Sequence, residues 1–323
     1  MKIRLIVCGL ATAAVLCALP GTARAQILVV NSGNGAPGAG SIGEYTTSGT
    51  LLNPALISGL TCPAGIAISG DKLFVVNFLA GTISEYTTSG ALVNPSLISG
   101  LNFPGAIAVS GGFLYVSTSA VNVEADMIGK YTTSGATVNA TLIPGLGPVG
   151  DIKVSGNNLF YSDGIDNLVA KYTTSGALLN PNLVPNFVEG VNFARGIAVS
   201  GDKLFVVDEG TFPGTGTIGE YTTSGATVNP NLITGLIFPG TVALLGEDLF
   251  VTSGVNLASE NTMIGEYTTS GATVNAALIS GLNNLGDFAV LPESVPDASS
   301  TWTLLLLALT AMFGLKSLLR RPA

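Results

Sequence analysis

Tyr86-Thr87-Thr88-Ser89-Gly90 is one of six identical copies of the five-residue word YTTSG in this chain. The spacings between copies are 41, 45, 41, 49 and 46 residues, and the copies begin at Tyr45, Tyr86, Tyr131, Tyr172, Tyr221 and Tyr267. A repeat of that length has room for four short strands and three turns, which is the size of one propeller blade. The sequence therefore predicts an all-β protein built from repeated four-stranded units.

The residues around the second copy show the strands of one unit. Gly65–Ser69 and Lys72–Asn77 are apolar runs joined by Gly70-Asp71, a pair suited to a tight hairpin turn. Gly81–Tyr86 is the expected third strand and Ala91–Asn94 the fourth, and the YTTSG word makes the turn between them. We expect the six tyrosines to pack between neighbouring blades. The alternative is a ring of aromatic groups that stack on a ligand.

The two ends of the repeat region are incomplete in complementary ways. Ile27–Asn31 matches the second strand of the unit, so the N-terminal repeat lacks a first strand. The missing strand appears as Asp287–Leu291, after the sixth YTTSG word. We predict that one blade takes one strand from the C-terminal end and three from the N-terminal end. This arrangement closes six blades into a ring and leaves no open end with an exposed sheet edge.

The differences in length between repeats fall in two kinds of loop. From the last residue of the second strand to the next YTTSG tyrosine the count is 9 after Asn77 and Asp163, and 13 or 14 in the other copies. Extra chain also lies around residues 186–195, before a first strand. In an up-and-down blade both loops emerge on one face, and insertions on one face of a repeat array typically mark the binding face. Phe78 and Phe212 are the aromatic residues expected in these loops.

Polar residues end the second strands of all six blades, and these are the candidate binding residues: Asn31, Asn77, Thr118, Asp163, Asp208 and Ser253. Asp151 and Asp287 begin first strands, which are expected to line the central channel. Asp163 and Asp208 lie in adjacent blades and are the best candidates for ligands of a calcium ion, which prefers carboxylate oxygens. The alternative is that the polar side chains cap turns.

Two segments carry a resemblance to a known family: FPGAIAVSGGFLYVSTS at residues 103–119 and ARGIAVSGDKLFVVDEG at residues 194–210. They resemble the P-x-G-I-A-V-D and L-Y-V-A-D pattern of NHL-type six-bladed propellers, and they are also similar to gluconolactonase-like propellers. The first strand ends in Ser where that pattern has Asp. The resemblance implies a six-bladed propeller over nearly all of residues 26–291, and such propellers include lyases, lactonases and plain binding modules.

The composition narrows the possible chemistry. The chain contains no histidine, which excludes a Ser-His-Asp triad and most zinc sites. Residues 26–297 hold all 20 acidic residues and six basic ones, a net charge of −14, so nucleic acid is not an expected partner. We expect a non-catalytic protein without a cofactor. The alternative is a calcium-dependent lactonase or lyase that uses the channel carboxylates.

Both ends of the chain have the pattern of targeting segments. Residues 1–25 form an expected signal peptide, with Lys2 and Arg4 before an apolar run and a cleavage site at Ala23–Ala25. Residues 292–301 form a linker that contains prolines. Residues 302–323 contain an apolar run long enough for one transmembrane helix and a basic end that is expected to stay in the cytoplasm.

The order of the C-terminal elements is Val295-Pro296-Asp297, a Ser/Thr-rich spacer, an apolar helix and Arg320-Arg321. This order resembles a PEP-CTERM-type sorting signal in its Val-Pro-Asp variant. The resemblance implies recognition by an exosortase-type enzyme and a destination at the bacterial cell envelope or in the extracellular matrix. The resemblance also implies that the protein is found among exopolysaccharides. A matrix polymer or another surface protein is therefore the expected partner, and the propeller is expected to be a monomer. An ordinary C-terminal membrane anchor is the alternative.

Overall fold

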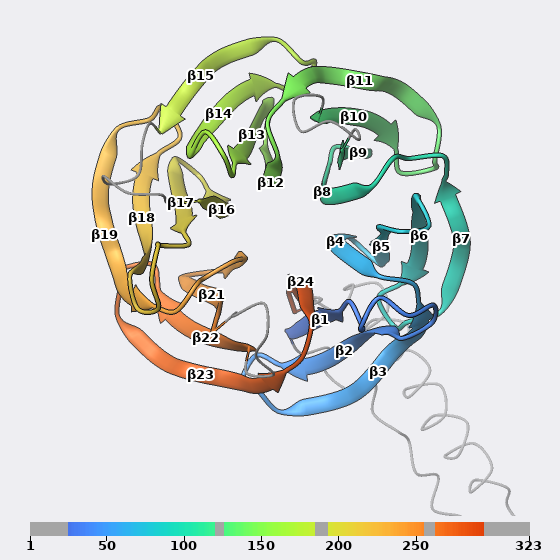
Figure 1. The fold of residues 1–323 in the computed structure, drawn as a ribbon, viewed down its shortest axis with the longest axis horizontal. Helices are drawn as coiled ribbons and strands as arrows, with labels where there is room; N and C mark the ends of the chain where they lie inside the picture. The colour runs from blue at the N-terminus through green and yellow to red at the C-terminus, as the bar shows by residue number, and fades with distance from the viewer. Residues whose placement is uncertain (1–24, 120–125, 185–192, 255–261, 294–323) are drawn as a thin grey trace, which may run out of the picture. The chain divides into compact units, whose positions relative to one another are not determined.

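A computed structural model of the chain describes residues 25–119, 126–184, 193–254 and 262–293. In the compact unit Ala25–Pro292 these residues form six four-stranded antiparallel sheets arranged as a ring (Figure 1). The all-β six-bladed propeller predicted from the repeat is confirmed. The expected signal peptide and the expected transmembrane helix at residues 302–323 lie outside the described residues. Within the described part, no helix has the length and apolar character needed to cross a membrane.

Each blade has four strands, numbered from the channel outward. Blade 1 contains β24 (Leu285–Leu291), β1 (Gln26–Asn31), β2 (Gly40–Thr46) and β3 (Leu51–Leu60). Blade 2 contains β4 (Pro63–Ser69), β5 (Lys72–Asn77), β6 (Thr82–Thr87) and β7 (Leu92–Ile98). Blade 3 contains β8 (Pro104–Ser110), β9 (Phe113–Thr118), β10 (Asp126–Thr132) and β11 (Thr137–Leu146).

The other three blades repeat this order. Blade 4 contains β12 (Val149–Ser155), β13 (Asn158–Asp163), β14 (Leu168–Thr173) and β15 (Leu178–Val184). Blade 5 contains β16 (Ala194–Ser200), β17 (Lys203–Asp208), β18 (Gly216–Thr222) and β19 (Thr227–Leu236). Blade 6 contains β20 (Val242–Leu245), β21 (Asp248–Ser253), β22 (Thr262–Thr268) and β23 (Thr273–Leu282).

Blade 1 closes the ring as the sequence predicted. β24 pairs antiparallel with β1, with Leu291 opposite Gln26 and Phe288 opposite Val29. The blade therefore combines one C-terminal strand with three N-terminal strands. Figure 1 shows the two ends of the coloured chain side by side in this blade.

The hydrophobic core consists of six clusters, each formed by residues of two neighbouring blades. Every cluster includes one tyrosine of a YTTSG word. Tyr86 of blade 2, for example, packs with Leu28 and Ile57 of blade 1. Burial of such a ring stabilises the contact between blades by a few kcal/mol, about the cost of truncating a buried aromatic side chain. The predicted packing of the tyrosines between blades is confirmed.

The rest of the YTTSG word is also explained by its local contacts. In the second copy, the hydroxyls of Thr87 and Ser89 hydrogen-bond at 2.8 Å, and Thr87 Oγ1 accepts the Ala91 N–H at 3.0 Å. Gly90 has a φ of +86°, and a Cβ there would lie 2.6 Å from the Leu56 carbonyl oxygen of blade 1. The other five copies repeat the Thr–Ser bond, the positive φ and the close approach to a leucine of the preceding blade. The word is constant because it docks each blade on the previous one.

The predicted fourth strand, Ala91–Asn94, is too short. The fourth strands have seven or ten residues, and β7 continues through Pro95 to Ile98. Asn94 Oδ1 accepts the Ser96 N–H at 3.0 Å, and the pairing register with β6 shifts nearby. Proline is tolerated on an outer strand because its missing N–H faces no partner strand. The Asn-Pro pair therefore marks a bulge, where the sequence interpretation placed the end of the strand.

Candidate functional site

On one face of the ring lie the described loops between second and third strands and the described connections from a fourth strand to the next first strand. We call this face the variable face. The described second-to-third loops cover residues 32–39 and 209–215 in two blades, and only 78–81 and 164–167 in two others. First strands begin at this face and second strands end there. A cavity of about 340 Å³ lies here, at the mouth of the central channel.

Small side chains form most of the channel wall. At the level of Asp287 in β24, the other five blades contribute Gly65, Ala106, Asp151, Gly196 and Thr241. Two residues further along each first strand, five blades have alanine and blade 4 has Lys153. The wall therefore leaves space for a ligand and concentrates its charge on Asp151, Lys153 and Asp287.

Asp151 is fully engaged by neighbouring groups. Lys153 Nζ donates to both carboxylate oxygens, at 2.7 and 2.6 Å. The Ile152 N–H donates to Oδ1 at 2.7 Å, and the Ile197 N–H of blade 5 donates to Oδ2 at 2.9 Å. Asp151 therefore links blades 4 and 5, and its negative charge is neutralised by Lys153.

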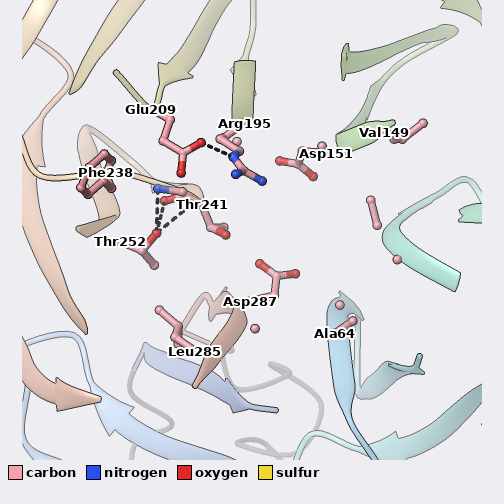
Figure 2. A pocket seen from close by; sticks show the side chains of 17 residues that line it. Ala64, Val149, Asp151, Arg195, Glu209, Phe238, Thr241, Thr252, Leu285 and Asp287 are labelled. Atoms are coloured by element: carbon pink, nitrogen blue, oxygen red, sulfur yellow. Dashed lines mark hydrogen bonds and ion pairs between the residues drawn. The ribbon is translucent and has the colours of Figure 1, made fainter. Parts of the chain in front are cut away.

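Asp287 occupies the equivalent position in the opposite blade (Figures 1 and 2). Its Oδ1 accepts the Phe288 N–H at 2.8 Å and its Oδ2 accepts the Ile66 N–H of blade 2 at 3.2 Å. Burial raises the pKa of the Asp287 carboxyl to about 6, and Asp151 adds to the rise, while Lys153 and the two N–H groups oppose it. The side chain is enclosed by protein but still partly reachable from the channel. Asp287 therefore becomes protonated more readily than an ordinary aspartate.

Charged and aromatic residues lie at several places on the variable face, and we call them the rim. Arg195 Nε and Glu209 Oε2 form an ion pair at 2.8 Å, drawn in Figure 2, and the guanidinium lies 5.7 Å from the centre of the Phe193 ring. Phe103 contacts Phe78 with ring centres 5.3 Å apart, and 41% of Phe103 is exposed. Phe238 lines the cavity itself. The rim thus offers ring faces and charged groups to solvent.

The sequence interpretation missed Phe103, Phe193 and Phe238 and named only Phe78 and Phe212 as loop aromatics. All three missed residues lie shortly before a first strand, in the words NFP, NFA and IFP. Phe103 and Phe193 directly precede β8 and β16, and Phe238 lies four positions before the start of β20. Phe103 and Phe238 have φ angles of +40° and +41°, a left-handed conformation that is uncommon for bulky residues. A phenylalanine repeated at this one position in three blades was the signal that could have identified them.

The predicted ring of polar residues lies on the variable face, at the ends of the second strands, but none of its six members lines the 340 Å³ cavity. Five of them are buried, and Asn31 is half-buried. Asp163 Oδ1 accepts the N–H groups of Ile165 and Asp166, and Asp208 Oδ1 accepts that of Gly210, all at 2.9 Å. Asn31 likewise accepts the Gly33 N–H, Asn77 donates to Thr82 and Ser84, and Ser253 bonds to Ile237. The contacts of Asn31, Asp163 and Asp208 cap turns, as in the turn-capping alternative, whereas Asn77 and Ser253 bond to a neighbouring strand and connection.

The calcium alternative rested on Asp163 and Asp208. Among the residues that the structure describes, no group of three or more His, Cys, Asp or Glu side chains is placed to hold a metal ion. Burial raises the pKa of Asp208, while its bond from Gly210 opposes the rise. Calcium binding at this pair remains a prediction from the sequence.

No model of a known protein family matches the chain, and no curated protein matches it. A chain in a crystal structure of a nidogen/laminin complex is similar over 84% of this chain and all of its own length, with a TM-score of 0.62 and 13% identity. TolB from Acinetobacter baumannii is similar over 86% of this chain and 69% of its own, with a TM-score of 0.58 and 15% identity. A gluconolactonase from Xanthomonas campestris is similar over 68% of this chain and 77% of its own, with a TM-score of 0.53 and 14% identity.

Identities this low establish a shared fold and nothing about activity. The architecture and these similarities define the class of the protein: a closed six-bladed β-propeller with a cavity at the channel mouth.

Proposed function

We propose that the protein is a non-catalytic extracytoplasmic propeller, displayed on or released from a bacterial envelope, that binds a matrix polysaccharide through its variable face. Another surface protein is the alternative partner. One observation carries the proposal: the variable face combines an open cavity with an aromatic and charged rim, whereas the constant YTTSG words are occupied in joining blades.

The chemistry of the mouth suits a sugar chain. A sugar ring offers apolar C–H faces that pack on aromatic rings, and hydroxyls that hydrogen-bond to charged and polar groups. Phe193 is 36% exposed beside Arg195, and Thr241 and Glu209 line the cavity. A cavity of about 340 Å³ is at the small end of ligand sites, a size suited to one or two sugar units.

The polar contacts favour binding over acid–base catalysis. Asp151 is neutralised by Lys153, and Glu209 is paired with Arg195. Both Asp151 and Asp287 accept N–H groups from two blades, so their positions stabilise the ring. These contacts hold the Asp151 and Asp287 carboxylates in place as part of the structure that joins the blades.

A calcium-dependent lactonase or lyase is the second candidate. The observation that favours it is the pKa of Asp287, raised to about 6, because a carboxylate with such a pKa suits a general base near neutral pH. Lactone hydrolysis measured with added calcium tests this candidate. Activity that Asp287→Asn abolishes would replace the binding proposal with this one.

The binding proposal is tested with the surface polysaccharide purified from the producing bacterium. The double variant Phe193→Ala/Phe238→Ala is expected to bind at least about fivefold more weakly, because each lost ring contact costs about 0.5–1.5 kcal/mol or more. Leu92→Ala, at a 56% exposed position on outer strand β7, is the control and should bind like the wild type. Unchanged binding by the double variant, with its fold verified by circular dichroism, would exclude the variable-face site.

The cellular location of the protein is proposed from the sequence at the two ends of the chain. Residues 1–25 direct export, and Val295-Pro296-Asp297 with the basic end at Arg320-Arg321 directs processing by an exosortase-type enzyme. Deletion of residues 295–323 is expected to shift the protein from the envelope fraction to the medium. An envelope fraction as large as that of the full chain would contradict the sorting role.

A further inference from the structure

Asp151 and Asp287 have equivalent positions and equivalent backbone contacts, but only Asp151 has a lysine two residues later in its strand. Both are in first strands, in opposite blades, and each accepts one N–H from its own strand and one from the next blade. Two residues after Asp151 comes Lys153, whose ammonium group binds both carboxylate oxygens. Two residues after Asp287 comes Ala289. The blade 4 carboxylate therefore has a cation from its own strand, and the blade 1 carboxylate lacks one at that position.

Asp287 has no salt bridge with any described residue, although the charge of Lys153 lowers its pKa through space. Glu209 is paired with Arg195, and Lys153 is held by Asp151. The strands packed against β24 are β1, β4 and β20, and none of them contains a charged residue. Among the described residues, no lysine or arginine forms a salt bridge with Asp287. One negative charge therefore remains in the cavity wall.

We propose that the mouth cavity binds the protonated amine of an amino-sugar unit, and that this amine pairs with Asp287 as Lys153 pairs with Asp151. The inference rests on the proposed polysaccharide-binding function. An enclosed carboxylate without a cationic partner is unfavourable, and an ammonium group of a ligand reduces that penalty. Each Asp287 oxygen has one N–H donor in the structure, so each can accept a further bond from the channel side.

The surroundings favour a sugar as the carrier of the amine. Figure 2 shows Asp287 facing the same space as Asp151, Arg195 and Thr241. Thr241, Arg195 and Glu209 lie where the hydroxyls of a ring would need partners, and Phe238 lies at the edge of the same cavity. The cavity is open on the variable face, so a polymer can continue outward past Phe193.

The proposal predicts a pH dependence with a definite sign. Asp287 faces Asp151 and Lys153 from β12, and these groups together with burial set its pKa at about 6. The charged carboxylate that pairs with the amine is present above this pH and lost below it. Between pH 7 and pH 5 the charged fraction of Asp287 falls about tenfold, so the affinity for an amine that stays protonated over this range falls by about the same factor.

The test is calorimetric titration of the secreted chain with a glucosamine disaccharide and with its N-acetylated counterpart, in which the amine is capped. The amine form is expected to bind at least tenfold more tightly at pH 7. Asp287→Asn removes the charge, and Ala289→Lys supplies an internal cation in the register of Lys153. Each variant should abolish the preference for the amine. Asp202→Asn, in the exposed turn between β16 and β17, is the control and should keep it.

Equal binding of the two disaccharides by the wild type would overturn the amine inference and leave polysaccharide binding intact. A preference that survives in both Asp287→Asn and Ala289→Lys would also overturn it. Tighter binding of Nα-acetyl-lysine methylamide than of the glucosamine disaccharide would assign the cavity to a protein side chain and overturn the sugar assignment. Failure of the wild type to bind the native polysaccharide at all would instead contradict the proposed function.

Discussion

Deletion of β24 (Leu285–Leu291) is expected to unfold the whole propeller, because this strand closes the ring. The deletion removes the pairing with β1 along five residue pairs, the Asp287 bond to Ile66 and the buried Phe288 ring. Loss of the Phe288 side chain alone is expected to cost about 3–5 kcal/mol, a large part of the 5–15 kcal/mol that typically stabilises a domain. The exposed edge of β1 also becomes a template for aggregation.

The measurement is thermal unfolding by circular dichroism of two truncated chains. One ends after Asn284 and lacks β24, and the matched control ends after Glu293 and keeps it. The control is expected to melt in one cooperative transition, and the shorter chain to have no such transition. A melting temperature within a few degrees of the control would contradict the closure role of β24.

Gly90→Ala is expected to destabilise the protein by about 3 kcal/mol or more, the sum of backbone strain and overpacking. Gly90 has a φ of +86°, and the new Cβ would lie 2.6 Å from the Leu56 carbonyl oxygen and 3.0 Å from Leu56 Cγ. The outer strand of blade 1 would have to move, and with it the contact between two blades.

Gly100→Ala is the matched control, because Gly100 has a φ of +75° and no atom within 4 Å of its Cβ position. It should show the left-handed strain alone, about 1–2 kcal/mol. Chemical denaturation of both variants gives the difference in free energy of unfolding. Equal losses would mean that contact with the neighbouring blade does not explain the constant glycine.

The fold could be predicted from the sequence because its determinants are repeated and local. The number of YTTSG words equals the number of blades. The partial repeats at Ile27–Asn31 and Asp287–Leu291 complete one another, which predicts that the two chain ends close the ring in one blade. The fourth strands were predicted too short, because Asn-Pro commonly ends a strand in sequence but here forms a bulge on an outer strand. Whether Asn-Pro ends a strand or forms a bulge depends on which edge of the sheet faces solvent.

For the candidate site, the sequence predicted the face of the ring but not the residues that line the cavity. The face was inferred from loop lengths, and the cavity does lie there. Asp163, one of the residues chosen at the strand ends, bonds to its own turn, and its role in binding stays a prediction. A short polar side chain after a strand has the same pattern whether it caps a turn or faces a ligand, so position alone did not separate the two. The aromatic rim was missed because Phe103 and Phe238 reach it through left-handed backbone angles.

The assignment of binding to the variable face and of blade docking to the YTTSG words is tested most directly by hydrogen exchange with and without the polysaccharide. Binding is expected to slow amide exchange at residues 193–196, 209–215 and 237–241, around the mouth, and to leave the exposed turns that follow Tyr86 and Tyr221 unchanged. Protection confined to the YTTSG turns, with no change around the mouth, would contradict the assignment.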